Sequence, residues 1–160
     1  SIYNITPFDI KELIKNIIDA HTDQLSRKNL GLRVTYGDNL PQINADKTRL
    51  QFAIQILLEN SIVYTPQNGK IEISVKYDNA KKSFVFIVKD SGIGIDRNDM
   101  PNLFKKFFRT ANARLTDTEG MGIGLYMAKK IVMRHNGNIT VESGGENKGT
   151  VFTFTIPQVS

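Results

Sequence analysis

Asp90 and the glycines that follow it are the residues whose types and spacing best suit ligand chemistry in this chain. The apolar run at 84–88 precedes them, and its β-branched and aromatic content predicts a strand buried on both faces. That strand ends at the carboxylate of Asp90, and Gly92 and Gly94 remove side chains where the backbone turns. The segment favours a pocket that offers a hydrogen-bond acceptor to a flat ligand, with an ordinary strand and tight turn as the alternative.

A second glycine cluster, Gly120, Gly122 and Gly124, stands immediately before a predicted helix at about 125–135. Backbone N–H groups at a helix start, together with the helix dipole, favour anionic groups such as phosphates. The spacing matches neither the dinucleotide-binding fingerprint nor a P-loop. Alone, the cluster fits a flexible loop as well as a phosphate site, but its coexistence with the first glycine segment favours the phosphate site.

Two further segments contain groups that a metal ion or phosphates could use. Asn60 lies in a mostly apolar predicted helix, and one amide oxygen is an adequate protein ligand for Mg²⁺ in a nucleotide site. The alternative is a buried asparagine bonded to the backbone. Lys106 and Arg109 accompany a short aromatic segment. They could form a solvated basic face, or they could belong to a lid that carries cations to the outer phosphates. The polar stretch 110–119 is expected to belong to that lid.

Periodicity predicts the elements that must position these groups. Helical spacing of apolar residues follows Thr6-Pro7 and resumes near Asp46, and this second helix should end at Thr65, because Pro66 follows it. Strands are predicted at 30–36, 71–77, 84–88, 139–143 and 150–156, largely as hairpins. This mixture favours the α+β class, a two-layer sandwich with helices on one face of a mixed, mostly antiparallel sheet.

Composition narrows the class of protein further. The chain has 160 residues, 40% of them hydrophobic and 23% charged, which fits one globular domain over residues 1–160. No run approaches the ~18 apolar residues of a membrane span, and a lack of cysteine excludes disulfides and thiolate metal sites. The net charge of +5 suits an anionic ligand, but the basic residues are spread along the chain, which argues against a nucleic-acid partner.

Four motifs resemble, in order and interval, the N, G1, F and G2 boxes of sensor histidine kinases. They are LLENSIVYTP around Asn60, DSGIGI from Asp90, LFKKFFRT from Leu103 and GMGIGL from Gly120. The tail HNGNITVES…GTVFTFTIP is similar to the end of the same domain, so the resemblance covers about residues 8–157. It implies the Bergerat fold of the gyrase, Hsp90, histidine kinase and MutL superfamily, and the catalytic ATP-binding domain of a two-component kinase.

The resemblance also implies roles for single residues. Asp90 would accept a hydrogen bond from the adenine amino group, and Asn60 would coordinate Mg²⁺, so ATP and Mg²⁺ are the implied cofactors. Lys106 and Arg109 would lie near the phosphates and, with Asn60, form the catalytic set. The other positions implied to contact the nucleotide are Tyr64, Gly92, Gly94, Ile95, Gly120, Gly122, Ile123, Gly124, Leu125 and Thr150.

The resemblance implies partners as well. In such kinases the phosphoryl group passes to a histidine of a separate dimerisation domain, and a response regulator acts indirectly. His21 and His135 are instead expected to be helix C-terminal residues, where partial positive charge is favourable. We therefore expect a cytoplasmic catalytic domain without its phosphoacceptor domain and without membrane contact of its own, whether or not the parent kinase is anchored in the inner membrane.

Two positions on the helix face of Asn60 depart from the family pattern. Ile56 stands where the family usually has a polar residue, and Val63 stands where it usually has a lysine. Three hypotheses follow: an active kinase domain, a degenerate nucleotide-binding or interaction module with weak or no kinase activity, and an ATPase of the gyrase or Hsp90 branch. The third is disfavoured by the short chain, the LFKKFFRT segment and the lack of a glutamate at position 56.

Overall fold

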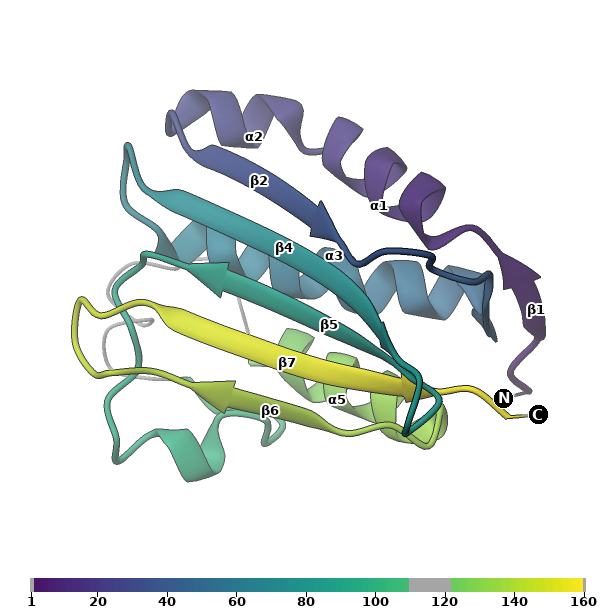
Figure 1. Ribbon diagram of the computed structural model, residues 1–160. Helices are drawn as coiled ribbons and strands as arrows, with labels where there is room; N and C mark the ends of the chain where they lie inside the picture. Colours follow the sequence, from purple (N-terminus) through teal and green to yellow (C-terminus); the bar gives the residue numbers. More distant parts are fainter. Residues whose placement is uncertain (1, 110–121, 160) are drawn as a thin grey trace.

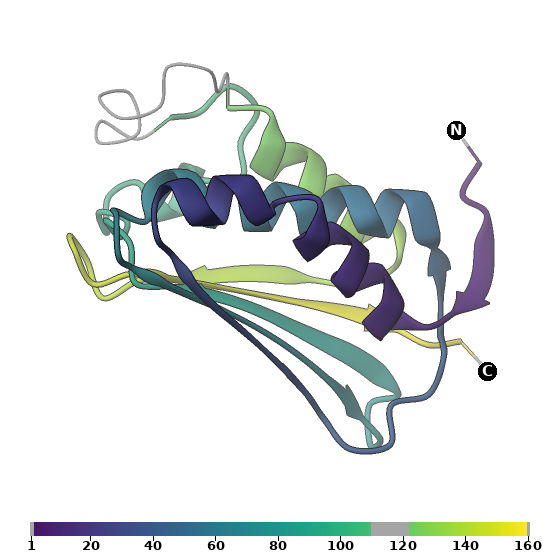
Figure 2. The same ribbon diagram turned by 90° about the horizontal axis from the view of Figure 1, so that it is seen from above.

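Helices cover one face of a five-stranded sheet in the computed structural model, which describes residues 2–109 and 122–159 (Figures 1 and 2). The strand order is β2-β4-β5-β7-β6, with β2 parallel to β4 and the other neighbours antiparallel. The strands are β2 (Gly31–Tyr36), β4 (Lys70–Asp78), β5 (Ser83–Asp90), β6 (Ile139–Glu142) and β7 (Thr150–Pro157). The predicted α+β sandwich with a mixed, mostly antiparallel sheet is confirmed.

The helical layer contains α1 (Ile10–Asp19), α2 (Thr22–Arg27), α3 (Lys47–Tyr64) and α5 (Gly124–Arg134). α3 packs against both α1 and α5, and it lies between them over the sheet (Figure 1). The core beneath α3 is aromatic, with the rings of Phe86 and Phe154 stacked at a centroid distance of 4.4 Å. Within the described ranges, no helix is both long enough and apolar enough to cross a membrane.

Both ends of α3 follow from local signals, as predicted. The carboxylate of Asp46 accepts a hydrogen bond from the Arg49 N–H at 3.0 Å, which caps the N-terminus. Burial by itself raises the pKa of Asp46, but hydrogen bonds from the backbone of Arg49 and Asn4 and from the Arg49 guanidinium bring that pKa below its ordinary value. Thr65 has an extended backbone because Pro66 follows it, and the helix ends at Tyr64.

The predicted helix start at Thr6-Pro7 is wrong. Both residues lie in β1 (Ile5–Phe8), which pairs antiparallel with β3 (Ile43–Asp46), a small sheet that the sequence did not predict. Proline fits there because every strand of a two-stranded sheet has a free edge that needs no N–H donor. The first helix is capped instead by Asp9, whose carboxylate accepts from the Lys11 N–H at 2.9 Å.

The strand that ends at Asp90 is not buried on both faces, contrary to the prediction. β5 lies in the middle of the sheet between β4 and β7, with Phe84 and Phe86 buried. The alternate residues Val85 and Ile87 are only half-buried. This difference arises because helices cover one face of the sheet and leave the other without a second layer (Figure 2).

Both histidines are buried near helix ends. His135 directly follows α5; its Nδ1 donates to the Ile131 carbonyl at 2.9 Å and its Nε2 accepts from the Asp46 N–H at 3.0 Å. His21, expected to be a helix C-terminal residue, lies just beyond the first helix, between α1 and α2, where its Nδ1 donates to the Ile17 carbonyl at 2.7 Å. These contacts give both rings structural roles.

Candidate functional site

Asp90, the last residue of β5, has a buried carboxylate whose two oxygens each accept a hydrogen bond. Oδ1 accepts from the Gly92 N–H at 2.9 Å, and Oδ2 accepts from the Ser61 hydroxyl at 3.1 Å. Burial raises the pKa of Asp90, and the hydrogen bonds from Gly92, Ser61 and the Thr150 backbone offset that rise only in part. The side chain is thus a preoriented acceptor at the end of a central strand.

β7 and the C-terminal end of α3 both come close to this carboxylate at the end of β5. Thr150, the first residue of β7, is buried and pairs directly with Asp90 in the β5–β7 register. Tyr64, the last residue of α3, is half-buried, and its carbonyl accepts from the Ile93 N–H at 3.0 Å. The structure therefore brings together the acceptor, the aromatic residue and the hydroxyl residue that the sequence singled out.

Gly92 and Gly94 permit close approach to protein backbone. A Cβ on Gly92 would collide with the carbonyl of Tyr64. Gly94 has φ +72°, and a Cβ there would collide with the carbonyl of Gly145. Packing within the protein thus explains both glycines, and their predicted contact with a ligand stays a prediction.

The loop after β5 is bonded to the turn between β6 and β7. The Ile93 carbonyl accepts from the Asn147 N–H at 2.7 Å. Ile95 is buried, and its N–H donates to the Ser143 hydroxyl oxygen at 3.0 Å, while that hydroxyl donates to the Gly149 carbonyl at 2.7 Å. These bonds fix the loop that holds Gly92 and Gly94, so this side of the site is preformed.

Asn60 precedes Ser61 on α3 and is half-buried, and within the described residues its side chain makes no hydrogen bond. Ile56, four residues earlier on the same helix face, lies 3.3 Å from where a Cβ of Gly124 would stand. That face of α3 is therefore directed toward the start of α5. In the described ranges, no three His, Cys, Asp or Glu side chains gather into a metal site. The Asn60 amide oxygen is a candidate ligand for Mg²⁺, an ion that keeps several waters and takes few protein oxygens in nucleotide sites.

The second glycine segment leads into α5, which begins at Gly124. Its N-cap residue, Ile123, is partly exposed and provides no side-chain cap, so the first N–H groups of α5 have no capping partner of that kind. Gly122 has φ +72°, and its carbonyl accepts from the Phe107 N–H at 2.9 Å. Leu125 is half-buried against the core. Gly120 and the predicted lid at 110–119 lie outside the described residues.

Lys106, a basic residue of the F-box segment, lies near this helix start. Lys106 Nζ is 5.4 Å from the ring centroid of Phe107 and 5.6 Å from that of Tyr126, in the first turn of α5. Arg109 is half-buried and is the last described residue before residue 122. Lys106 thus places a cation beside the first turn of α5.

Sequence reasoning missed several residues that shape the site. Ser61 could have been found, because it is a hydroxyl residue on the apolar face of the helix and directly follows Asn60. Ser143 and Gly149 gave no such signal, since their contacts with the loop after β5 depend on the pairing of distant strands. Each acts by holding the loop or the carboxylate in place.

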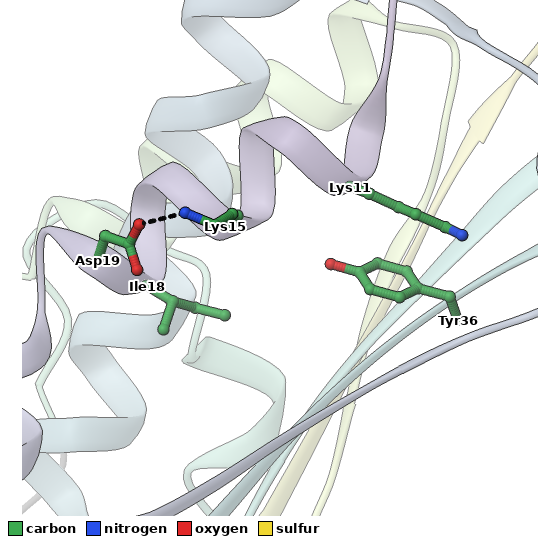
Figure 3. Close-up of a pocket in the computed structure, with 5 residues that line it drawn as sticks. All are labelled: Lys11, Lys15, Ile18, Asp19 and Tyr36. Carbon is green, nitrogen blue, oxygen red and sulfur yellow. Dashed lines mark hydrogen bonds and ion pairs between the residues drawn. The ribbon is translucent and has the colours of Figure 1, made fainter.

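A separate pocket lies between α1 and β2 (Figure 3). It is lined by Lys11, Lys15, Ile18, Asp19 and Tyr36. Lys15 forms an ion pair with Asp19 at 2.9 Å, and burial together with the charge of Asp9 raises the pKa of Tyr36. β2 is at the edge of the sheet and does not pair with β5 or β7, so this pocket is distinct from the site around Asp90.

The sequence is similar to a known protein family and to curated kinases. Residues 45–160 match the model of the family described as "Histidine kinase-, DNA gyrase B-, and HSP90-like ATPase". The chain is 33% identical over 123 residues to the sensor histidine kinase WalK of Bacillus subtilis, covering 74% of this chain and 20% of WalK. It is 32% identical over 151 residues to the adaptive-response sensory kinase SasA of Synechocystis, covering 94% of this chain and 38% of SasA. The chain therefore spans well under half the length of these relatives.

Solved structures show the same fold. The catalytic domain of histidine kinase ThkA, in a nucleotide-free form, matches with a TM-score of 0.83 and 30% identity, covering 98% of this chain and 99% of that chain. ThkA in complex with response regulator protein TrrA matches with a TM-score of 0.79 and 26% identity, covering 97% of this chain and 42% of that chain. The architecture around Asp90 is thus that of a histidine kinase catalytic domain.

Proposed function

Because the chain belongs to the family of histidine kinase-, DNA gyrase B- and HSP90-like ATPases, we propose that it binds Mg²⁺–ATP and donates the γ-phosphoryl group to a histidine of a separate dimerisation domain. The relatives WalK, SasA and ThkA are sensory or histidine kinases, which favours the kinase branch. The observation that carries the proposal is the buried carboxylate of Asp90, preoriented by Ser61 and Gly92.

Asp90 accounts for the choice of base. A carboxylate oxygen accepts a hydrogen bond from the exocyclic amine of adenine, whereas guanine presents a carbonyl oxygen at that position and repels it. Thr150 pairs with Asp90 in the sheet, and the Tyr64 carbonyl is bonded to the loop that follows Asp90, so a hydroxyl residue and an aromatic residue stand close to the carboxylate. Binding of the base would require little rearrangement, because the loop after β5 is already bonded to the β6–β7 turn.

Asn60 and Lys106 account for the phosphate end. The Asn60 amide oxygen, which has no hydrogen bond within the described residues, would hold Mg²⁺; the ion, when bound, neutralises phosphate charge. Lys106 and the N-terminal N–H groups of α5 favour negative charge beside it. Phosphoryl transfer depends mainly on positioning and charge neutralisation, so this chain needs no nucleophile of its own.

Partners and location belong to the same proposal. ThkA is seen in complex with a response regulator, and we expect the parent of this chain to act on one indirectly, through the phosphorylated histidine. We expect neither a nucleic acid nor a membrane to be a partner of this domain, as the spread of its basic residues along the chain suggests for nucleic acid. The reaction is assigned to the cytoplasm, where ATP is the phosphoryl donor.

A second candidate is a degenerate module that binds nucleotide without phosphotransfer. Ile56 packs toward the start of α5 and Val63 is exposed, and both side chains are apolar, so neither offers a polar group to a metal or phosphate. The helix face of Asn60 therefore has one ligand where the family pattern has up to three. The loss of a charged contact is worth about 1.5–3 kcal/mol.

Phosphotransfer to an added domain distinguishes the two candidates. The chain is incubated with Mg²⁺ and ATP labelled in its γ-phosphate, together with histidine-bearing dimerisation domains from several sensor kinases, SasA and WalK among them. If the chain is an active kinase domain, an added domain should acquire acid-labile, alkali-stable label. A domain whose histidine is replaced by glutamine should acquire no label, and the Asn60→Ala variant of this chain should transfer almost none. ATP binding without transfer to any of these domains would favour the degenerate module.

A further inference from the structure

Two polar side chains from the α1–α2 segment reach the last two turns of α3, the part of that helix that carries Asn60. They are His21, between the two helices, and Lys28, directly after α2. α2 and the C-terminal end of α3 lie at the same end of the molecule in both views (Figures 1 and 2). Neither residue belongs to the site described above.

His21 is 3% exposed and is held on both sides of its ring. Nδ1 donates to the Ile17 carbonyl at 2.7 Å, and Nε2 lies 2.7 Å from Oε2 of Glu59. The same Glu59 oxygen accepts from Nε2 of Gln55 at 3.0 Å. The residue directly before Asn60 is therefore tied to a buried ring on the neighbouring helices.

Lys28 caps the C-terminus of α3. Its Nζ donates to the carbonyls of Ile62 at 2.6 Å and Val63 at 3.1 Å, two of the last carbonyls that lack partners within the helix. Its own carbonyl accepts from the Asn68 N–H at 2.8 Å, which also fixes the loop after α3. A single side chain thus holds the helix end immediately beyond Asn60.

The opposite side of the same turns is bonded to the loop after β5. Ser61 donates to Asp90 at 3.1 Å, and the Tyr64 carbonyl accepts from Ile93 at 3.0 Å. Between these two sets of contacts, the Asn60 side chain makes no hydrogen bond within the described ranges. The rotation of this part of α3 is fixed while the amide is left available.

We propose that His21 and Lys28 are positioning residues, which hold residues 59–63 so that Asn60 meets the metal–phosphate end of the nucleotide without rearrangement. The inference rests on the proposed function, because that function assigns Asn60 to Mg²⁺. Groups that orient a metal ligand matter nearly as much as the ligand itself, since a small rotation of the helix end displaces the amide oxygen.

The test compares affinity for Mg²⁺–ATP with affinity for adenosine, which lacks phosphates and reaches only the Asp90 end. Lys28→Met removes the two bonds to α3 while keeping the side-chain length, and Lys28→Arg restores donors. Glu59→Gln weakens the His21 link through its more exposed partner and leaves the buried ring in place. Lys15→Met, in an exposed ion pair on α1, is the matched control. Binding is followed by NMR titration, with Tm measured for each variant.

We expect Lys28→Met and Glu59→Gln to weaken Mg²⁺–ATP binding by about tenfold and to leave adenosine binding unchanged. Lys28→Arg should recover most of the loss, and Lys15→Met should match the unmodified chain. Equal losses for both ligands, or none for Mg²⁺–ATP, would overturn the inference. If Mg²⁺ does not strengthen ATP binding by the unmodified chain, the proposed function is wrong in assigning Asn60 to Mg²⁺.

Discussion

At the scale of single residues, Asp90 shows how ligand readiness and stability oppose each other. Burial raises its pKa, so the folded state binds a proton more tightly than the unfolded chain does. The stability that the protonated form contributes is present below the ordinary aspartate pKa and is lost as the pH rises through the raised pKa. Ionisation of this buried carboxylate, which leaves it a stronger hydrogen-bond acceptor, therefore comes at some expense of stability.

Asp90→Asn should raise Tm at neutral pH. The amide keeps an acceptor for the Gly92 N–H and a donor for the Ser61 oxygen, and it removes the buried charge. Each 1 kcal/mol gained corresponds to about 2–4 °C in a chain of this size. Scanning calorimetry from mildly acidic to neutral pH should also show a flatter pH dependence than in the unmodified chain. A variant with a lower Tm at neutral pH would show that the charge is well solvated.

Gly94→Ala should be destabilising because of backbone contact, with no ligand involved. A Cβ at φ +72° is strained and also meets the Gly145 carbonyl, so we expect a loss of about 1–3 kcal/mol in the free energy of unfolding. Gly31→Ala is the control, since a Cβ at that position would lie 3.9 Å from its nearest neighbour, Cγ of Lys70. Urea denaturation measures both. Similar losses at the two positions would contradict this account of Gly94.

Asp90 could be predicted from the sequence, but the residues that hold it in place could not. Asp90 could be selected because it directly follows an apolar run, which is a local signal. The partners that hold it and its neighbours could not, because Ser61 lies 29 residues from Asp90, and His21 lies 38 residues from Glu59. Such contacts depend on how helices pack, and spacing along the chain does not reveal them.

At the scale of elements, α3 connects the two ends of the site. It carries Asn60, ends at Tyr64 against the loop after β5, and presents Ile56 toward the start of α5. In the proposed function, this one helix would therefore set the distance between an adenine at Asp90 and phosphates near α5. A change that moves Asn60 but keeps the Ser61–Asp90 and Tyr64–Ile93 bonds should affect the metal–phosphate end more than the adenine end.

The double variant Ile56→Asn, Val63→Lys tests which way this helix face is directed. If both positions face the phosphates, Mg²⁺–ATP should bind more tightly while adenosine binding is unchanged. Position 56 is half-buried, and an unpaired amide there costs about 1–3 kcal/mol, so Tm is measured alongside affinity. Phe52→Lys adds the same charge farther from the site, on an exposed position of α3, as a control. If the double variant folds well but does not bind Mg²⁺–ATP more tightly, the assignment of Asn60 as the metal ligand would be in doubt.

The boundaries of elements could be predicted where a local signal decides them. Asp46 and Thr65-Pro66 define α3 by capping and by the proline rule. The β1–β3 pair was missed, because each strand has four residues and the two are far apart in the sequence. Pro7 resembles the first residue of a helix in a local pattern, and only its pairing with Asn44 shows otherwise.

At the scale of the whole molecule, the site depends on one non-local pairing. Hairpins predict that β4 pairs with β5 and β6 with β7, and both pairs are found. The β5–β7 pairing, which places Thr150 beside Asp90, joins these two hairpins and has no local signal in the sequence. The class of fold was therefore predictable, while the strand order that assembles the site was not.

The chain should not phosphorylate its own histidines. His21 and His135 are 3% and 7% exposed, and every ring nitrogen lies within hydrogen-bond distance of a partner. Incubation with Mg²⁺ and γ-labelled ATP, without an added domain, should leave no acid-labile, alkali-stable phosphate on the chain. Label that disappears in a His21→Gln or His135→Gln variant would show that one of these rings is an acceptor.

The most direct measurement compares the affinities of the chain for ATP and GTP in the presence of Mg²⁺, by isothermal titration calorimetry. Because Asp90 is assigned to the adenine amine, ATP should bind at least about tenfold more tightly than GTP, as the loss of one charge-assisted hydrogen bond predicts. That preference should shrink in Asp90→Asn, whose amide can satisfy a carbonyl as well as an amine. Equal affinity of the unmodified chain for ATP and GTP would contradict the assignment of Asp90, and with it the proposed site.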